Sequence, residues 1–361
     1  MIIEDISQSE ILPADVCVVG SGPVGLAVAL ECERHGLRVN VLESGMKRYS
    51  HESQLLSAFE IADLTRHASS DIAQWRGLGG TSERWGGRCV PLEEIDFRKR
   101  PHVPESGWPI SHAELKPYYS VAASLLDCGT ANFTAPSSLN GVSGDVSVTE
   151  LERWSRQPRI RIVHKDRLSR SGRLRVHLGC NVVRLAIAES GKVSGAVVRA
   201  GERCFEVKAR IFVLAASGVE NTRLLLNTRA EHPVSFGGED GGLGRFYMGH
   251  VAGSIARIEI ENPILASSLR FIQDCERVFV RRRFTLAPAV QERLNLLNIA
   301  LWLDNRPLED PWHQSGTLSA AHLGIFLPAS SMLGLATTFV SSKAGPFVIT
   351  FGTSPAPPAK P

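Results

Sequence analysis

The segment DVCVVGSGPVGLAVALECERHGLRVNVLE, residues 15–43, contains the strongest structural signal in the chain. Its apolar start, 15–19, predicts a buried strand that runs into a glycine-rich turn. A helix is expected next, with Pro23 in the first turn, where its missing N–H is not needed, and Gly36 at the end. RVNVL at 38–42 then predicts a second strand, which closes a βαβ unit with two parallel strands.

The turn between the first strand and the helix has the pattern G-x-G-x-x-G. Glycines there permit a tight turn, close approach to a pyrophosphate and close packing of helix on strand, and the helix N-terminus favours an anion. Glu43 ends the second strand, where its carboxylate can accept hydrogen bonds from ribose hydroxyls and would repel a 2′-phosphate, which disfavours NADP. The alternative is a chance glycine-rich turn. The predicted dinucleotide-binding residues are Gly20, Ser21, Gly22, Pro23, Val24, Gly25, Glu43 and Ser44.

A second glycine-rich segment, WRGLGGTSERWGGR at 75–88, has five glycines in fourteen residues. That is too many for the interior of a helix or strand, and it predicts backbone lying close to a ligand. Farther on, Ser111 with Glu114 three residues later predicts a capped helix. Residues 130–150 are expected to include a polar loop or lid.

Apolar runs, and segments in which polar and apolar residues alternate, predict further strands. RLRVHL (173–178), KVSGAVVRA (192–200) and CFEVKA (204–209) are expected to form a small antiparallel meander. RIFVLA at 210–215 predicts another buried parallel strand, followed by a helix over 219–228. From about residue 251 the alternation predicts strands of a second sheet.

Five segments, in order along the chain, resemble the glucose-methanol-choline (GMC) oxidoreductases. Together they cover roughly residues 14–250, and five linked segments are more specific than one loop motif. The segments are VCVVGSGPVGLAVALECERHGLRVNVLESG, GLGGTSERWGG, SGWPISHAELKPYYSVA, ARIFVLAASGVENTRLLL and GLGRFYMGH.

The Rossmann pattern alone does not separate FAD from NAD, and the resemblance implies FAD. In the family, the segment matching Gly79, Gly80, Thr81, Ser82, Trp85 and Gly86 wraps the flavin pyrophosphate and ring. Val182 and Val183 match the strand whose backbone meets the adenine end. Ala215, Ala216, Ser217 and Glu220 match the motif that closes over the cofactor from the opposite side. For each residue a structural role is the alternative: the glycines could serve only to turn, Trp85 could only fill a core, and Glu220 could cap or pair with Arg223.

Some family members attach FAD through a histidine near the motif that matches Trp85. This chain has Glu83 and Arg84 there, so the resemblance implies non-covalent FAD.

The resemblance leaves the catalytic residues unassigned. GMC enzymes remove the hydroxyl proton with a histidine near the C-terminus while the carbon gives hydride to flavin N5, and no matching motif occurs in this chain, which stops before the family's length. His250 matches a family position outside the catalytic pair and is expected to be structural; His313 and His322 are weaker candidates. Loss of a general base typically costs about 10²- to 10⁴-fold in rate. No histidine or cysteine cluster has metal-ligand spacing, so no metal is predicted.

Bulk composition limits the function classes. The 361 residues exceed one ordinary hydrophobic core and predict two lobes or one large discontinuous domain. A content of 43% hydrophobic and 21% charged residues is typical of globular proteins. A net charge of +3 does not predict a broad basic surface for nucleic acid. The basic run Arg281, Arg282, Arg283 is expected to be a solvated strand face.

The expected setting is cytoplasmic and reduced. Seven cysteines are scattered without a CxxC pair, and the start MIIEDISQSE has no basic and apolar signal pattern. The uncharged run 311–342 is too polar and broken to predict a membrane span, and it is expected to be a buried wall of the substrate lobe.

These observations predict an α/β fold: an FAD-binding Rossmann-like, three-layer domain over 1–250 and a second, incomplete sheet-containing substrate domain over 251–361 with a Pro-rich tail. The predicted function is FAD-dependent oxidation of CH–OH groups in a small-molecule alcohol or sugar. The alternatives are a catalytically silent FAD-binding protein or truncated fragment, and an NAD-linked dehydrogenase. The identity of the substrate, the electron acceptor and the oligomeric state are not readable from the sequence.

Overall fold

A computed structural model describes residues 1–4, 11–63, 65, 67–135, 144–250, 252–258, 260–304 and 347–351. Several sequence predictions lie outside these residues. They concern the uncharged run, His313, His322, the Pro-rich tail and the middle of the loop predicted at 130–150.

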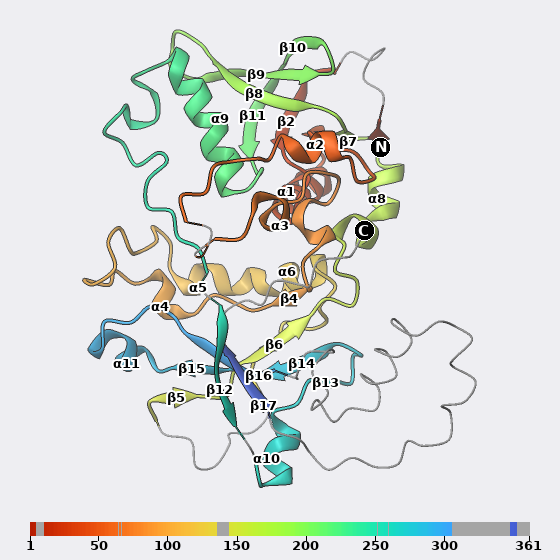
Figure 1. Cartoon of the computed structure of the whole chain (residues 1–361). Helices are drawn as coiled ribbons and strands as arrows, with labels where there is room; N and C mark the ends of the chain where they lie inside the picture. The colour runs from red at the N-terminus through yellow and green to blue at the C-terminus, as the bar shows by residue number, and fades with distance from the viewer. Residues whose placement is uncertain are drawn as a thin grey trace, which may run out of the picture.

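The upper lobe is built on a five-stranded parallel sheet with the strand order β1-β7-β3-β2-β11 (Figure 1). The predicted βαβ unit is confirmed, because β2 and β3 pair in parallel and α1 connects them. Helix α1 starts at a proline, as predicted, and the chain passes through Gly36 at φ +82° after its end. The bounds are β1 Ile2–Ile3, β2 Ala14–Val19, α1 Pro23–Arg34, β3 Val39–Leu42, β7 Leu174–His177 and β11 Ala209–Leu214.

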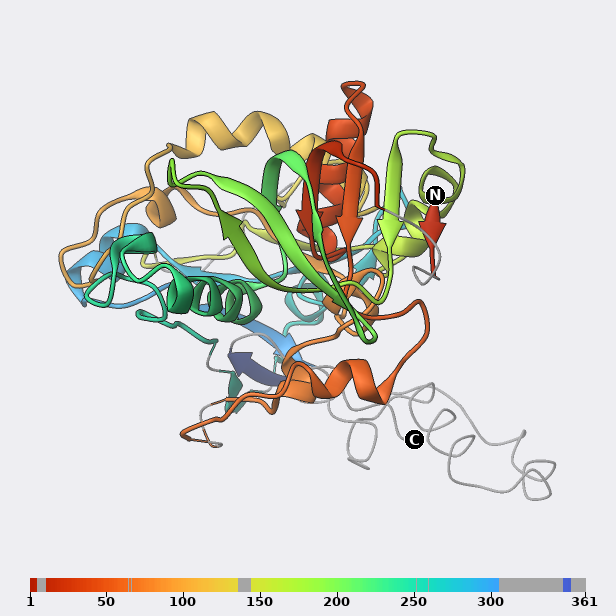
Figure 2. The ribbon, with the colours of Figure 1, turned by 90° about the horizontal axis from the view of Figure 1, so that it is seen from above.

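This lobe has three layers, because successive side chains of β2 point to opposite faces of the parallel sheet and pack in two separate cores. Val16 and Val18 pack in a core with α1, whereas Cys17 and Val19 pack in a second core with the antiparallel meander β8-β9-β10. The meander forms the top layer in Figure 1, and Figure 2 views the molecule from that side. The predicted three-layer α/β class is thus confirmed. The bounds of the meander are β8 Asn181–Ile187, β9 Val193–Ala200 and β10 Arg203–Val207.

The assignment of RLRVHL to the meander was wrong, because this run forms β7 inside the parallel sheet, between β1 and β3. Its alternating polar residues suggested one solvated face, yet His177 at a polar position is buried against Asn40. The run at 210–215 is a parallel strand as predicted, but β11 forms the sheet edge and Ile211 is 56% exposed.

Helices and turns outside the sheets connect the layers. The predicted helix after β11 is α9, Gly218–Glu231, and the predicted Ser111–Glu114 capping box begins α5. No helix in the described ranges is long and apolar enough to cross a membrane. The remaining bounds are α2 His51–Leu55, α3 Ser70–Ala73, η1 Gly80–Glu83, α4 Glu94–Phe97, α5 His112–Leu115, η2 Lys116–Tyr118, α6 Tyr119–Leu125, α7 Ile160–Val163, α8 Lys165–Arg170, η3 Ser235–Gly237, α10 Pro263–Ser268 and α11 Pro288–Arg293.

The lower lobe contains two further sheets, with orders β13-β14-β6-β4 and β12-β17-β16-β15-β5 (Figure 1). Every strand pair recorded in them is antiparallel, and they include strands predicted after residue 251. Three of their strands, β4, β5 and β6, precede residue 250, so these sheets are not divided at that position. The bounds are β4 Arg88–Cys89, β5 Val146–Ser147, β6 Leu151–Trp154, β12 Gly253–Ile258, β13 Ile272–Gln273, β14 Phe279–Arg282, β15 Phe284–Leu286, β16 Ala300–Asp304 and β17 Phe347–Phe351.

The basic run 281–283 is buried, which corrects the expectation of a solvated strand face: all three arginines are 8–9% exposed. Arg281 donates to the buried carboxylate of Glu152 at 2.6 Å, and Arg88 lies 3.4 Å from its other oxygen. The Trp302 ring, 2% exposed, lies within 5.1 Å of both guanidinium carbons. Arg281 is therefore buried because a carboxylate and an aromatic face compensate for its lost hydration, and Arg283 is paired with Glu93 at 2.8 Å.

We predict that Glu152→Leu lowers the free energy of unfolding by about 3–5 kcal/mol, because the buried Arg281 and the half-buried Arg88 then lose their shared carboxylate. Urea denaturation measures this change. The matched control is Glu94→Gln, which breaks an exposed pair with Arg98 and should cost at most about 1 kcal/mol. Equal destabilisation by the two variants would contradict a stabilising role for the buried pair.

A second buried polar contact lies within the parallel sheet, between His177 on β7 and Asn40 on β3. The imidazole Nε2 and the amide Oδ1 are 3.2 Å apart, and Nδ1 is buried without a hydrogen-bond partner in the described structure. Burial lowers the pKa of His177 to about 4, and the charges of Arg175 and the N-terminal ammonium act in the same direction. The imidazole is therefore neutral in the folded protein near pH 7.

Because the folded pKa of His177 lies below the unfolded value, its contribution to stability is complete above pH 6.5 and is lost as pH falls through 4. We predict that His177→Gln, whose side chain cannot titrate, reduces the loss of stability between pH 6.5 and 4 by up to about 3 kcal/mol. Urea midpoints of wild type and the variant across this range give the measurement. Parallel pH profiles would refute the assignment.

Candidate functional site

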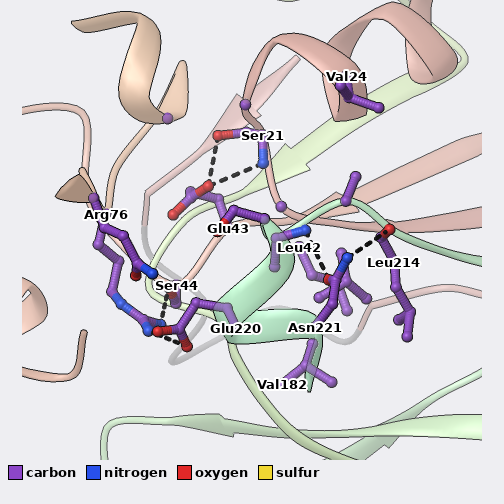
Figure 3. A pocket seen from close by; sticks show the side chains of 18 of the residues that line it. Ser21, Val24, Leu42, Glu43, Ser44, Arg76, Val182, Leu214, Glu220 and Asn221 are labelled. Carbon is purple, nitrogen blue, oxygen red and sulfur yellow. Dashed lines mark hydrogen bonds and ion pairs between the residues drawn. The ribbon is translucent and has the colours of Figure 1, made fainter. Parts of the chain in front are cut away.

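A cavity of about 420 Å³ opens at the carboxyl ends of three parallel strands, β2, β3 and β11 (Figure 3). Ligands of open α/β sheets bind in crevices at this edge. Fourteen of the predicted site residues line it, and they come from segments far apart in the sequence. They are Gly20 to Val24, Glu43, Ser44, Gly80, Thr81, Val182, Ala215 to Ser217, and Glu220.

The first glycine-rich turn is shaped by contacts that exclude any side chain. Gly20 has φ +100°, and a Cβ there would lie 2.6 Å from the carbonyl oxygen of Ala215. A Cβ on Gly25 would lie 2.0 Å from the carbonyl oxygen of Gly20, so the helix could not approach the strand. A Cβ on Gly22 would lie 4.0 Å from the Cα of Gly80, which is ordinary contact, so this position leaves space in front of the N-terminus of α1. The steric roles predicted for Gly20 in the turn and Gly25 at the helix–strand contact are thus found, and the approach of a pyrophosphate to Gly22 stays a prediction.

The second glycine-rich segment packs directly on the first. Gly80 has φ +55°, and a Cβ on it would lie 2.7 Å from the Cα of Gly22. The backbone N–H of Gly79 donates to the Ser21 hydroxyl at 3.2 Å. Two glycine-rich segments, more than fifty residues apart in the sequence, therefore form one continuous main-chain surface along the cavity.

Glu43 stands beside this surface and is 5% exposed. Its Oε2 accepts from both the backbone N–H (3.0 Å) and the hydroxyl (2.7 Å) of Ser21, and its Oε1 accepts from the N–H of Gly45 at 2.8 Å. The carboxylate therefore orients the glycine-rich turn, and Oε1 retains a lone pair for a further donor.

Two helices begin at the cavity, α1 with twelve residues and α9 with fourteen. Neither first turn is capped by a side chain, so backbone N–H groups remain free to meet a ligand. Ser217, the N-cap of α9, has φ +75°, which is a strained conformation for a residue with a Cβ. Both N-termini contribute partial positive charge, which favours an anionic group.

Arg76 is a cavity residue that the sequence analysis missed. Its guanidinium donates to the hydroxyl of Ser44 at 2.7 Å and to the carboxylate of Glu220 at 2.6 Å (Figure 3). It lies within the glycine-rich segment 75–88, and its position directly before the first glycine of that segment was the available signal.

Asn221 is a second missed residue, and it holds the loop between β11 and α9. Its Oδ1 accepts from the N–H of Ala216 at 3.0 Å, and its Nδ2 donates to the carbonyl of Leu214 at 3.2 Å. Those partners depend on the tertiary path of the loop, so no sequence pattern indicated them.

Six predicted residues do not line the cavity. Gly25 packs behind it against the backbone of Gly20, and Gly79 bonds through its N–H to the Ser21 hydroxyl and through its carbonyl to the Ser82 hydroxyl, which donates at 2.6 Å. The Trp85 indole donates to the carbonyl of Pro158 at 2.6 Å and packs against a small buried cluster, and its contact with a cofactor stays a prediction. A Cβ on Gly86 would meet no atom within 4 Å, and the Val183 carbonyl accepts from Asn227.

No histidine lines the cavity, so a general base is not identified among the residues that the structure describes. His250 is exposed. In the same described ranges, no group of three or more His, Cys, Asp or Glu side chains could hold a metal ion. All seven cysteines are described, and none forms a disulfide.

Comparison with known proteins finds relatives among dehydrogenases and oxidases. The chain is 22% identical over 324 residues to 2-methyl-1,2-propanediol dehydrogenase of Mycolicibacterium austroafricanum, covering 68% of this chain and 56% of the relative. It is 33% identical over 127 residues to 6'''-hydroxyparomomycin C oxidase of Streptomyces lividus, covering 32% of this chain and 23% of that protein. The predicted resemblance to oxidoreductases is thus confirmed.

No model of a known protein family matches the chain. Among solved structures, an FAD-dependent oxidoreductase from Chaetomium thermophilum shares 16% sequence identity with this chain and has a TM-score of 0.40. The match covers 59% of this chain and 47% of the chain in that structure. The chain spans about half the length of the first curated relative and about a quarter of the second.

We predict that Gly25→Ala lowers the free energy of unfolding by about 1–3 kcal/mol, because overpacking must separate α1 from β2. Gly172→Ala is the matched control, since no atom lies within 4 Å of a Cβ there and φ is not left-handed. Thermal and urea denaturation of both variants provide the test. A Gly25→Ala protein as stable as the control would show that the close helix–strand contact does not exist.

Proposed function

We propose that this protein is an FAD-dependent oxidoreductase acting on a CH–OH group of a small-molecule alcohol or sugar. The observation that carries the proposal is the main-chain surface of the two glycine-rich segments, with the Glu43 carboxylate beside it. The relatives, which are named for 2-methyl-1,2-propanediol and for 6'''-hydroxyparomomycin C, support this substrate class.

The residues at the cavity fit an adenine dinucleotide. Side-chain-free backbone at Gly20 and Gly22 can meet a pyrophosphate, and the N-termini of α1 and α9 favour its charge. Glu43 can accept a hydrogen bond from a ribose hydroxyl through Oε1. FAD, rather than NAD, is supported by the second glycine-rich segment, which the resemblance to GMC enzymes assigns to the flavin.

Non-covalent attachment is supported by the side chains near Trp85. Glu83 forms an ion pair with Arg161 at 2.9 Å, and the Arg84 guanidinium lies 4.3 Å from the centre of the Trp75 ring. Neither is the histidine through which some GMC enzymes attach FAD.

Bound FAD would supply the hydride acceptor, while this chain would bind and orient it and exclude water. We propose residues 1–250 as the part that holds FAD and 251–361 as the larger part of the substrate lobe, with β4 to β6 contributing to it. A cytoplasmic setting also remains a proposal. The second candidate function is silent flavin binding, which the unassigned catalytic residues of this chain leave open.

The experiment measures the visible absorbance of the protein's bound flavin while candidate substrates reduce it under anaerobic conditions. We expect purified protein to be yellow, to release FAD on acid denaturation, and to be bleached by at least one compound in a panel of vicinal diols, primary alcohols and sugars. Dithionite is the control, because it should bleach any accessible bound flavin. Bound FAD that only dithionite bleaches would favour the silent flavoprotein, and a colourless protein that rejects added FAD would overturn the proposal.

A further inference from the structure

Two of the seven cysteines, Cys89 and Cys128, lie together in a small buried core between β4 and α6 (Figure 1). Cys89 is on β4, directly after the second glycine-rich segment, and Cys128 follows the end of α6. Ala123 of α6 packs in the same core, and the two cysteines are 8% and 1% exposed. Neither forms a disulfide, so both are free thiols in this structure.

Arg153 on β6 fixes the two cysteines relative to each other. Cys89 is the partner of Arg153 in the antiparallel register of β4 and β6, and the Arg153 Nε donates to the Cys128 carbonyl at 2.9 Å. The guanidinium is held in turn by Asp274 at 2.7 Å and by Glu276 at 3.1 Å. The strand and the loop after α6 are therefore joined, and the two thiols are in hydrogen-bonding contact.

The hydrogen bond makes the two thiols unequal. It lowers the pKa of Cys128, which accepts it, and the positive charge of Arg153 acts in the same direction against the effect of burial. The same hydrogen bond, together with burial, raises the pKa of Cys89, which keeps its proton. Because the thiolate is the form of cysteine that attacks an oxidant, Cys128 is the nucleophile of the pair and Cys89 is the thiol beside it.

A second pair of buried cysteines provides a contrast. Cys17 on β2 and Cys180 pack in one core with aliphatic side chains and are 0% and 1% exposed. Burial raises the pKa of each of these thiols to about 12, and for Cys180 the neighbouring Cys17 and Glu43 act in the same direction. These two thiols are therefore expected to be inert.

We propose that Cys89 and Cys128 form a site of reversible oxidation, at which a hydroperoxide converts the two thiols to a disulfide. The Cys128 sulfur attacks one oxygen of hydrogen peroxide: an S–O bond forms, the O–O bond breaks, and the leaving hydroxide takes up the proton that Cys128 released. The Cys89 sulfur then attacks the Cys128 sulfur. An S–S bond forms, the S–O bond breaks, and the hydroxyl group leaves with the Cys89 proton as a second water. Two thiols thus lose two electrons to the peroxide, and a dithiol reductant reverses the change by exchange.

The test exposes the full chain to hydrogen peroxide, denatures it in iodoacetamide to block the remaining thiols, and maps the cysteines by mass spectrometry without reduction. We expect Cys89 and Cys128 to be recovered as two linked tryptic peptides, because Arg98 and Lys99 lie between them. Dithiothreitol should separate the peptides. Cys128 should be oxidised at least about tenfold faster than Cys17 or Cys180. The cross-link restricts the unfolded chain, so oxidation should raise the Tm by about 3–5 °C.

Three variants assign the roles within the pair. In Cys89→Ser, Cys128 should stop at the sulfenic acid, which dimedone traps, and peroxide should give no rise in Tm. In Cys128→Ser, Cys89 should remain a thiol under the same treatment. Cys204→Ser removes an exposed cysteine and is the matched control, which should form the disulfide as wild type does.

The inference is independent of the proposed function, because the reaction needs no flavin, so each can fail alone. Recovery of Cys89 and Cys128 as free thiols, at a peroxide concentration that oxidises the exposed Cys204, would overturn it. A disulfide that forms only in denatured protein, or rapid oxidation of Cys89 in Cys128→Ser, would also overturn it. If either serine variant does not fold, the peptide map of wild type still decides.

Discussion

The arrangement of the cavity depends on one steric constraint: main chain must touch main chain where β2 turns into α1. A Cβ on Gly25 would lie 2.0 Å from the Gly20 carbonyl oxygen, and one on Gly20 would lie 2.6 Å from that of Ala215. Because these positions lack side chains, three strand ends and two helix N-termini can converge on one cavity. Hydrogen bonds from Ser21 and Gly45 to Glu43 then hold the turn in place.

The features that the sequence predicted correctly are those determined by local patterns. The glycine spacing, the first-turn Pro23 and the acid that ends β3 each have a short-range physical cause, and all were found where expected. The second glycine-rich segment was also predicted to approach a ligand, and Gly80 and Thr81 line the cavity. The contact between Gly80 and Gly22 was not predictable, because it joins segments that only the tertiary fold brings together.

Except for Asn221, whose partners are the nearby Ala216 and Leu214, the features that were missed depend on partners distant in sequence. The Arg76 guanidinium bonds to residues of four segments that are far apart in the sequence, and no local sequence pattern predicts these partners. The run 281–283 has the pattern of a solvated strand face, but in the fold Glu152 on β6 and Trp302 on β16 contact Arg281 and compensate for its burial. Similarly, polar and apolar residues alternate along β7 as in a strand with one solvated face, yet β7 lies inside the parallel sheet and His177 at a polar position is buried.

The central claim is that this main-chain surface, with Glu43 beside it, binds an adenine dinucleotide. Calorimetric titration of flavin-free wild type with FAD, with ADP as competitor, tests it most directly. The account predicts one FAD per chain at micromolar affinity or tighter, displaced by ADP at higher concentration. A folded protein that shows no heat of binding with FAD, and none with ADP, would contradict it.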